Sequence, residues 1–104
     1  MREVVPRVAK LAILANPTNA GAPSFVAAMT DAASRSNIRV VVAEVTRAED
    51  FRNAFSVIRN ARPDGLLVMV EPLIGTRIPE VIEFAATTRL PVIYDNGGPP
   101  GGVD

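Results

Sequence analysis

Short apolar runs alternate with helical patterns along almost the whole chain, and this alternation limits the fold more than any other feature. The segments Val8 to Ala15, Ile38 to Val45 and Gly65 to Val70 are apolar at nearly every position. Such runs are typical of strands that are buried on both faces. Because each run is followed by a helical pattern, we expect parallel strands joined by right-handed crossovers.

Three helices are expected between and after these runs. Their apolar residues recur at three- and four-residue spacing, as one buried helix face requires. The first helix follows Pro23, the second follows Thr46, and the third starts at about Arg77. Asn37 is predicted to end the first helix in a left-handed conformation. Thr46 and Glu49 have the spacing of a capping box for the second helix.

The sequence therefore predicts an α/β fold with a small parallel sheet of about four strands and helices on both faces. Pro91 to Tyr94 is the expected fourth strand, and the expected strand order is 2-1-3-4, as in a small flavodoxin-like or Rossmann-like sheet. Residues 1–94 form one predicted domain. The segment 95–104 is rich in glycine and proline, and we expect it to be flexible or held by a partner.

Composition excludes several classes of function. The 104 residues include no cysteine and no histidine, which removes disulfides, thiolate nucleophiles, histidine bases and almost all zinc or haem sites. We therefore expect no metal and no cofactor. The 11 basic and 11 acidic residues balance, so no nucleic-acid partner is expected. No apolar run approaches the ~18 residues of a membrane span, and no signal peptide is recognised. The chain as written is expected in the cytoplasm, without membrane insertion.

Common enzyme motifs are missing as well. The sequence contains no G-x-G-x-x-G, no G-x-x-x-x-G-K-[ST] and no G-x-S-x-G pattern. Acid–base chemistry would depend on Glu71 and Asp95 alone, and no pattern marks either as a catalytic group. We predict a protein that is not an enzyme.

Candidate ligand-binding residues lie in the loops that follow the predicted strands, because parallel sheets bind ligands beyond the carboxyl ends of their strands. The loop after the first strand precedes a helix N-terminus, which favours a carboxylate or phosphate, although its polar residues could equally cap and close the loop. Glu71 could pair with a ligand ammonium or be a solvated loop acid. Tyr94 could be an edge aromatic only. The candidates are Asn16, Thr18, Asn19, Glu71, Tyr94 and Asp95.

An ordered set of segments resembles one protein family. The segments are Leu14-Ala15-Asn16-Pro17-Thr18-Asn19, Arg62-Pro63-Asp64-Gly65-Leu66-Leu67-Val68, Glu71-Pro72-Leu73 and Arg89-Leu90-Pro91-Val92-Ile93-Tyr94. Together they resemble the ABC-transporter substrate-binding proteins, of the type that includes tryptophan and tyrosine binders, over about residues 7–98. That family has two lobes that close on a ligand, and the resemblance covers one lobe. It implies ligand contacts from the same loops and, if the chain is a fragment, a periplasmic location.

Two functions follow from these observations. The first is a non-catalytic binding module for a small molecule of the amino-acid class. The alternative is a lobe that persists as a structural homodimer without a ligand, since a single lobe exposes an open sheet edge at the second or the fourth strand, and exposed edges favour self-association.

Overall fold

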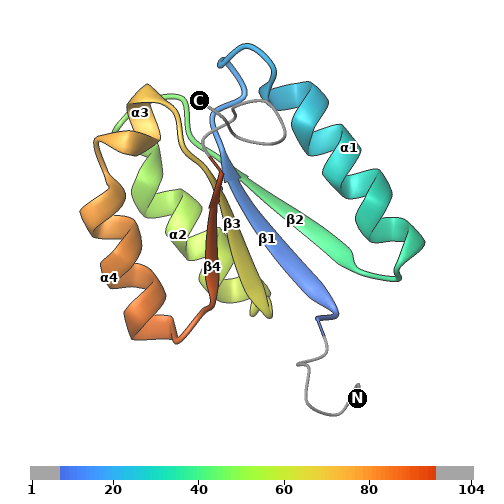
Figure 1. The fold of residues 1–104 in the computed structure, drawn as a ribbon. Coiled ribbons are helices and arrows are strands. Elements are labelled where there is room, and N and C mark those ends of the chain that lie inside the picture. The colour runs from blue at the N-terminus through green and yellow to red at the C-terminus, as the bar shows by residue number, and fades with distance from the viewer. Residues whose placement is uncertain (1–7, 96–104) are drawn as a thin grey trace.

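A four-stranded parallel sheet lies at the centre of the molecule (Figure 1). The computed structural model describes residues 8–95. Of the tail predicted over 95–104, Asp95 instead ends a strand, and residues 96–104 lie outside the described part. The order β2-β1-β3-β4 confirms the prediction. The strands are β1 (Lys10–Ala15), β2 (Arg39–Glu44), β3 (Gly65–Met69) and β4 (Val92–Asp95).

Helices cover both faces of the sheet, as predicted. Helix α1 (Ala22–Arg35) lies on one face, and α2 (Asp50–Ala61), α3 (Pro72–Gly75) and α4 (Ile78–Thr88) lie on the other (Figure 1). The one-turn helix α3 was not predicted, because Glu71-Pro72 was interpreted only as the end of a strand. No helix in the described part of the chain is long and apolar enough to cross a membrane.

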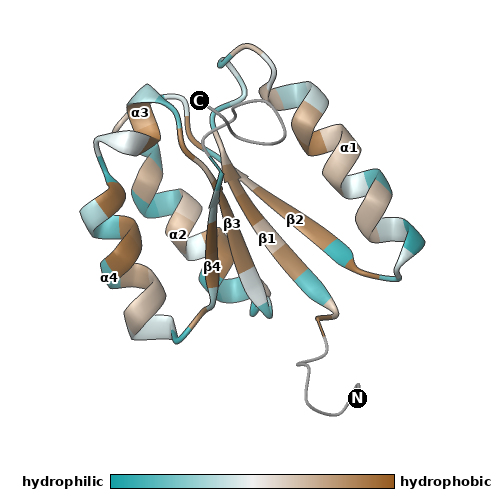
Figure 2. Cartoon of the chain, in the orientation of Figure 1, coloured by the Kyte–Doolittle hydropathy of each residue, from teal (hydrophilic) through white to brown (hydrophobic). Residues whose placement is uncertain are grey.

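Alternate side chains of the strands build two separate cores, one on each face. Leu14, Leu66 and Val68 belong to the core under α2 and α4, whereas Ile13 and Leu67 belong to the core under α1. All five are at most 5% exposed. The central strands are therefore hydrophobic along most of their length (Figure 2), which is why they show no alternation in sequence.

Aromatic packing joins the two long helices on the α2 and α4 face. The rings of Phe55 and Phe84 are stacked with their centroids 4.6 Å apart, and Phe51 meets Phe55 edge-on at 6.1 Å. Phe51 and Phe84 belong to the core on this face, and Phe55 packs against it.

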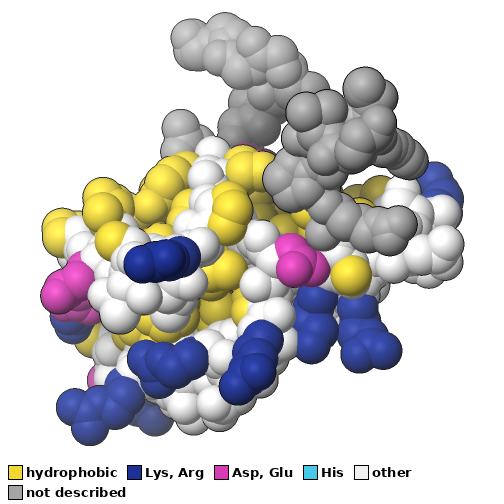
Figure 3. All heavy atoms as spheres, turned by 90° about the horizontal axis from the view of Figure 1, so that it is seen from below, with side chains coloured by type: hydrophobic (Ala, Val, Ile, Leu, Met, Phe, Trp, Pro, Cys, Tyr) yellow, Lys and Arg dark blue, Asp and Glu magenta, His cyan; other side chains and the backbone are white. Residues whose placement is uncertain are grey.

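The two ends of the sheet carry opposite charge. Cations gather at the amino ends of the strands, near the helix C-termini, where they offset the helix dipoles. Figure 3 looks at this end and shows Lys and Arg side chains bordering a hydrophobic area. These cations are Lys10, Arg39, Arg59, Arg62 and Arg89. The carboxyl ends of the strands instead carry Glu44, Glu71 and Asp95, with Asp50 at the start of α2.

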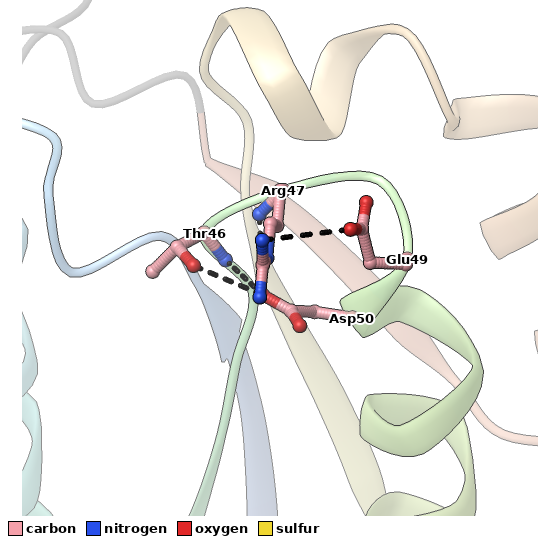
Figure 4. Close-up of polar contacts among 4 residues, drawn as sticks. All are labelled: Thr46, Arg47, Glu49 and Asp50. Carbon is pink, nitrogen blue, oxygen red and sulfur yellow. Dashed lines mark hydrogen bonds and ion pairs between the residues drawn. The ribbon is translucent and has the colours of Figure 1, made fainter.

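Of the two helix ends predicted from the sequence, one is confirmed and one is not. Asn37 has φ 61° just after α1, which confirms its predicted left-handed conformation. The capping box predicted for Thr46 and Glu49 is wrong, because Asp50 caps this turn instead. Its Oδ2 accepts from the backbone N–H of Thr46 at 2.9 Å, from the Thr46 hydroxyl at 3.0 Å and from the N–H of Arg47 at 3.2 Å (Figure 4). Glu49 forms an ion pair with Arg47.

Candidate functional site

A cavity of about 420 Å³ opens at the carboxyl ends of β3 and β4. One wall is the loop before α1 together with the start of that helix. The other wall is the end of β3 with the residues that follow it, and Asp95 from β4. The lining residues are Asn19, Ala20, Gly21, Ala22, Phe25, Met69, Val70, Glu71, Pro72 and Asp95. The volume lies in the range of small-molecule sites, roughly 300–1,000 Å³.

Helix α1 directs its N-terminus at this cavity. Its N-cap is Gly21, whose φ of 89° lies in the left-handed region that glycine adopts most easily. No side chain caps this end and its first turn has no acidic residue. In the first turn the N–H of Ala22 donates to the carbonyl of Asn19 at 3.0 Å and Pro23 has no N–H, so it is the positive end of the helix dipole that favours an anionic group in the cavity.

A chain of hydrogen bonds joins the ends of β1 and β3 behind the cavity. Asn16 is 7% exposed, and its Nδ2 donates to Oε1 of Glu71 at 3.0 Å. Its Oδ1 accepts from the N–H and the hydroxyl of Thr18 at 3.0 and 2.6 Å. Oε2 of Glu71 accepts from the N–H of Ile74 at 2.6 Å and so caps α3. The chain orients the carboxylate of Glu71 at the wall of the cavity.

Two carboxylates, Glu71 and Asp95, therefore lie across the cavity from the N-terminus of α1. Asp95 ends β4, beside Met69 in the sheet, and its carbonyl oxygen accepts from the N–H of Val70 at 2.7 Å. Both residues are half-buried. In the described part of the chain, no group of three or more His, Cys, Asp or Glu side chains is arranged to hold a metal ion.

The structure brings together three of the six predicted site residues as lining of this cavity: Asn19, Glu71 and Asp95. Asn16 and Thr18 belong to the hydrogen-bonded support behind it, which agrees with the loop-closing interpretation of these two residues. Tyr94 is paired with Val68 in the sheet, and Val68 faces the core under α2 and α4. Tyr94 therefore lies on the face opposite the cavity.

Several lining residues were not predicted from the sequence. Phe25 and Met69 were assigned to a helical stripe and a strand, and both do pack in the α1-side core. They reach the cavity because α1 begins at the edge of that core. The signal that could have found this wall is Pro23 at the second position of the helix, because proline in the first turn marks a helix start.

Comparison with known proteins gives the family. A family model described as ABC transporter substrate binding protein matches residues 1–98. The chain belongs to this family. A search of curated proteins gives no match. The family predicted from the ordered sequence segments is thus confirmed over nearly the whole chain.

Solved structures show that the fold is that of a substrate-binding protein. The chain is similar to a conserved domain protein from Vibrio cholerae, with a TM-score of 0.75 and 22% identity. It is also similar to a substrate binding protein with adhesive properties from Clostridium difficile in its ligand-free, open structure, with a TM-score of 0.78 and 22% identity. Each alignment covers 89% of this chain and 31% of the other, so the chain spans about a third of these proteins.

Proposed function

We propose that the cavity at the carboxyl ends of β3 and β4 binds a small zwitterion of the amino-acid class. The observation that carries this proposal is the pairing of an uncapped N-terminus of α1 with two carboxylates in one cavity. A ligand carboxylate meets the positive end of the α1 dipole, and its ammonium group meets Glu71 and Asp95. Phe25 and Met69 offer apolar surface to the rest of the ligand.

The hydrogen bonds of Glu71 support an ammonium-binding role. Each of its carboxylate oxygens accepts one bond within the protein, and each keeps a second lone pair. The side chain therefore needs no rearrangement to receive a ligand N–H. This preorganisation favours binding, because less conformational entropy is lost when the ligand arrives.

Affinity is expected to be low in this chain. The cavity is open, whereas high-affinity sites enclose most of their ligand. We expect dissociation constants in the millimolar range, about 4 kcal/mol of binding free energy. A second lobe, as in the longer relatives, would raise the affinity by covering the ligand.

The test is a titration of the protein with a panel of L-amino acids, in which binding is monitored by the NMR chemical shifts of backbone amides. We expect the amide shifts of Gly21 and Phe25 to saturate. The affinity derived from them should be about tenfold weaker in Glu71→Gln. Asp64→Asn is the matched control, since Asp64 is a loop acid at the opposite end of the sheet. Equal shifts in both variants, or none in the wild type, contradict the proposal.

We also propose that the protein is not an enzyme and works outside the cytoplasm, as substrate-binding proteins of this family do. The alternative function, a structural homodimer without a ligand, is favoured by one observation: among the described strands β4 lies at an edge of the sheet and has exposed apolar side chains. A dimer with no saturable amide shifts would support this alternative over the binding module.

A further inference from the structure

A second cavity, of about 320 Å³, lies between the C-terminal ends of α2 and α4. Pro63 and Leu90, which line it, directly precede β3 and β4, so the cavity is at the amino ends of these strands. It shares no lining residue with the cavity at the carboxyl ends. The lining residues are Ile58, Arg59, Arg62, Pro63, Thr88 and Leu90.

The buried part of this lining is apolar. Ile58 belongs to the core under α2 and α4 and is fully buried, and Leu90 packs against the same core. Pro63 is buried as well. Within the described residues, no acidic side chain lines the second cavity. A bound molecule therefore meets apolar surface and no negative charge in its deeper part.

The exposed part of the lining carries two arginines. Arg59 lies in the last turn of α2, and Arg62 is the C-cap of this helix. Cζ of Arg59 lies 5.6 Å from the centre of the Phe84 ring, so the side chain reaches across to α4. Neither arginine forms an ion pair within residues 8–95. Two guanidinium groups therefore border an apolar cavity without a bound carboxylate.

The dipole of α2 does not account for these arginines. A helix places about half a negative charge at its C-terminus. Lys10 already supplies a full positive charge there, because its Nζ donates to the carbonyl of Ala61 at 2.6 Å. The carbonyl of Arg59 is bonded as well, since it accepts from the backbone N–H of Arg62 at 3.2 Å. The guanidinium groups of Arg59 and Arg62 therefore exceed what the end of this helix requires.

Backbone conformation gives a second indication. Arg62 has φ 51° at the C-cap of α2, and Arg89 has φ 59° at the C-cap of α4. Glycine is the usual residue in this left-handed conformation, because a Cβ is disfavoured there. The other non-glycine residue with positive φ in the described chain is Asn37, a type that adopts it readily. An arginine at both C-caps therefore points to a use for the side chain.

The positive charge at this end of the sheet is local. The whole chain has 11 basic and 11 acidic residues, so no overall excess places cations here. Figure 3 shows Lys and Arg side chains bordering a hydrophobic area on this end of the molecule. The nearest acid in the sequence, Asp64, accepts from the backbone N–H groups of Ala9 and Lys10. A local positive potential over an apolar surface attracts anions that carry an apolar group.

We propose that the second cavity binds a small organic anion, in which a carboxylate or a phosphate monoester is joined to an apolar body. Guanidinium groups bind the oxygens of both anions through paired N–H donors. The anionic group lies between Arg59 and Arg62, and the apolar body packs against Ile58 and Leu90. The cavity volume falls in the range of small-molecule sites, roughly 300–1,000 Å³. This site is separate from the proposed amino-acid site and does not depend on it.

The test is a titration with hexanoate and with hexyl phosphate, monitored by the NMR chemical shifts of backbone amides. We expect saturable shifts at Arg62 and Leu90. Hexanamide has nearly the shape of hexanoate without its charge, and it should bind about tenfold more weakly or less well still. The tighter of the two anions identifies whether carboxylate or phosphate is the preferred group.

Two substitutions each remove one guanidinium group, Arg59→Gln and Arg62→Asn. Asparagine adopts the left-handed conformation readily, so the second variant should remain folded by circular dichroism. Each change should weaken binding about threefold, and the double variant about tenfold. Arg52→Gln is the matched control, because Arg52 is an exposed arginine of α2 that does not line the second cavity. Its affinity for the anions should equal that of the wild type.

Three results overturn the proposal: no saturable shift with either anion, equal affinity for hexanamide, or an Arg52→Gln variant weakened as much as the others. Shifts at Gly21 and Phe25 without shifts at Arg62 and Leu90 also overturn it, because they place the anion in the cavity at the carboxyl ends. Amino-acid binding is measured at Gly21 and Phe25, so failure of the proposed function is distinguished from failure of this second site.

Discussion

The two ends of the β1 and β3 pair are each joined by an acidic loop residue, but in different ways. At the amino end, Asp64 precedes β3, and its Oδ2 accepts from the backbone N–H groups of Ala9 and Lys10 at 2.8 and 3.0 Å. At the carboxyl end, Glu71 follows β3 and accepts from the side chain of Asn16. Asp64 thus accepts only from backbone groups of β1 and the residue before it, whereas Glu71 lines a cavity together with Asp95.

This difference teaches how the same residue type can serve stability at one end and recognition at the other. A carboxylate that bridges two backbone N–H groups, as Asp64 does, fixes the strand ends. A carboxylate held by a side chain and a helix N-terminus is oriented yet remains accessible. The comparison predicts that substitution of Asp64 changes stability alone, whereas substitutions at the carboxyl end separate into supporting and binding residues.

The largest effect is expected for Asn16→Ala. This change removes three hydrogen bonds at a buried position. The N–H of Thr18 and one carboxylate oxygen of Glu71 each lose their bond to the Asn16 side chain. We expect a loss of about 2–3 kcal/mol in the free energy of unfolding, measured by urea denaturation. Asn19→Ala is the control and should stay within about 0.5 kcal/mol. Similar losses in both variants would refute the supporting role of Asn16.

A smaller effect is expected for Asp64→Ala. The N–H groups of Ala9 and Lys10 can turn to water, because this end is exposed. We expect a lower Tm with unchanged ligand response, measured by calorimetry and by amide shifts. Asp31→Ala, which removes only an exposed i,i+4 ion pair with Arg35, should leave the Tm nearly unchanged. A change in ligand response in Asp64→Ala would remove the contrast between the two ends.

The pH dependence of stability should follow Asp64 and Asp50. Hydrogen bonds from Ala9 and Lys10 lower the pKa of Asp64, and those from Thr46 lower the pKa of Asp50. Because each folded pKa lies below its unfolded value, each carboxylate stabilises the fold above pH about 4, and this contribution is lost as the pH falls through the folded pKa.

Thermal unfolding between pH 2 and 7 (about the range that matters for carboxyl groups) tests this assignment. The Tm of the wild type should fall as the pH is lowered. The Tm of the double variant Asp50→Asn with Asp64→Asn should depend less on pH. Parallel profiles for the two proteins would mean that other carboxyl groups control acid stability.

The smallest effect on stability is expected for Glu71→Gln. The amide oxygen can still accept from the N–H of Ile74, so the start of α3 keeps its cap, whereas the amide NH2 replaces the second oxygen and the bond from Asn16 is lost. We expect a loss of less than about 1 kcal/mol in unfolding free energy, together with the weaker amino-acid binding described above. A large loss of stability with unchanged binding would make Glu71 equivalent to Asp64 and remove the basis for a site at this end.

Local patterns were sufficient for the architecture and insufficient for the details of the loops. The runs around Ile13 and Leu67 are apolar because both sheet faces are buried, so their position and order could be predicted from sequence. The hydrogen bonds of the turn before α2 could not be predicted, because Thr46 has two acids within reach, Glu49 and Asp50. Which of them closes the turn depends on the backbone path of the loop.

The candidate site shows the same division. The site was predicted at the carboxyl ends of the strands, and three of the predicted residues, Asn19, Glu71 and Asp95, line one cavity there. Whether a rim residue faces that cavity depends on side-chain alternation relative to a particular neighbour. Tyr94 is one position from Asp95 and lies on the other face because it is paired with Val68.

The sequence by itself determined the α/β class, the strand order, the family and the rim that carries the polar loops. The class and the strand order depend on hydrophobic periodicity and on the chirality of crossovers, whereas the family was indicated by the resemblance of ordered segments. Only the tertiary structure decided that Asn16 supports Glu71, that α1 directs an uncapped end at two carboxylates, and that Arg59 and Arg62 line one cavity. Those facts depend on contacts between residues far apart in the chain, which no local pattern records.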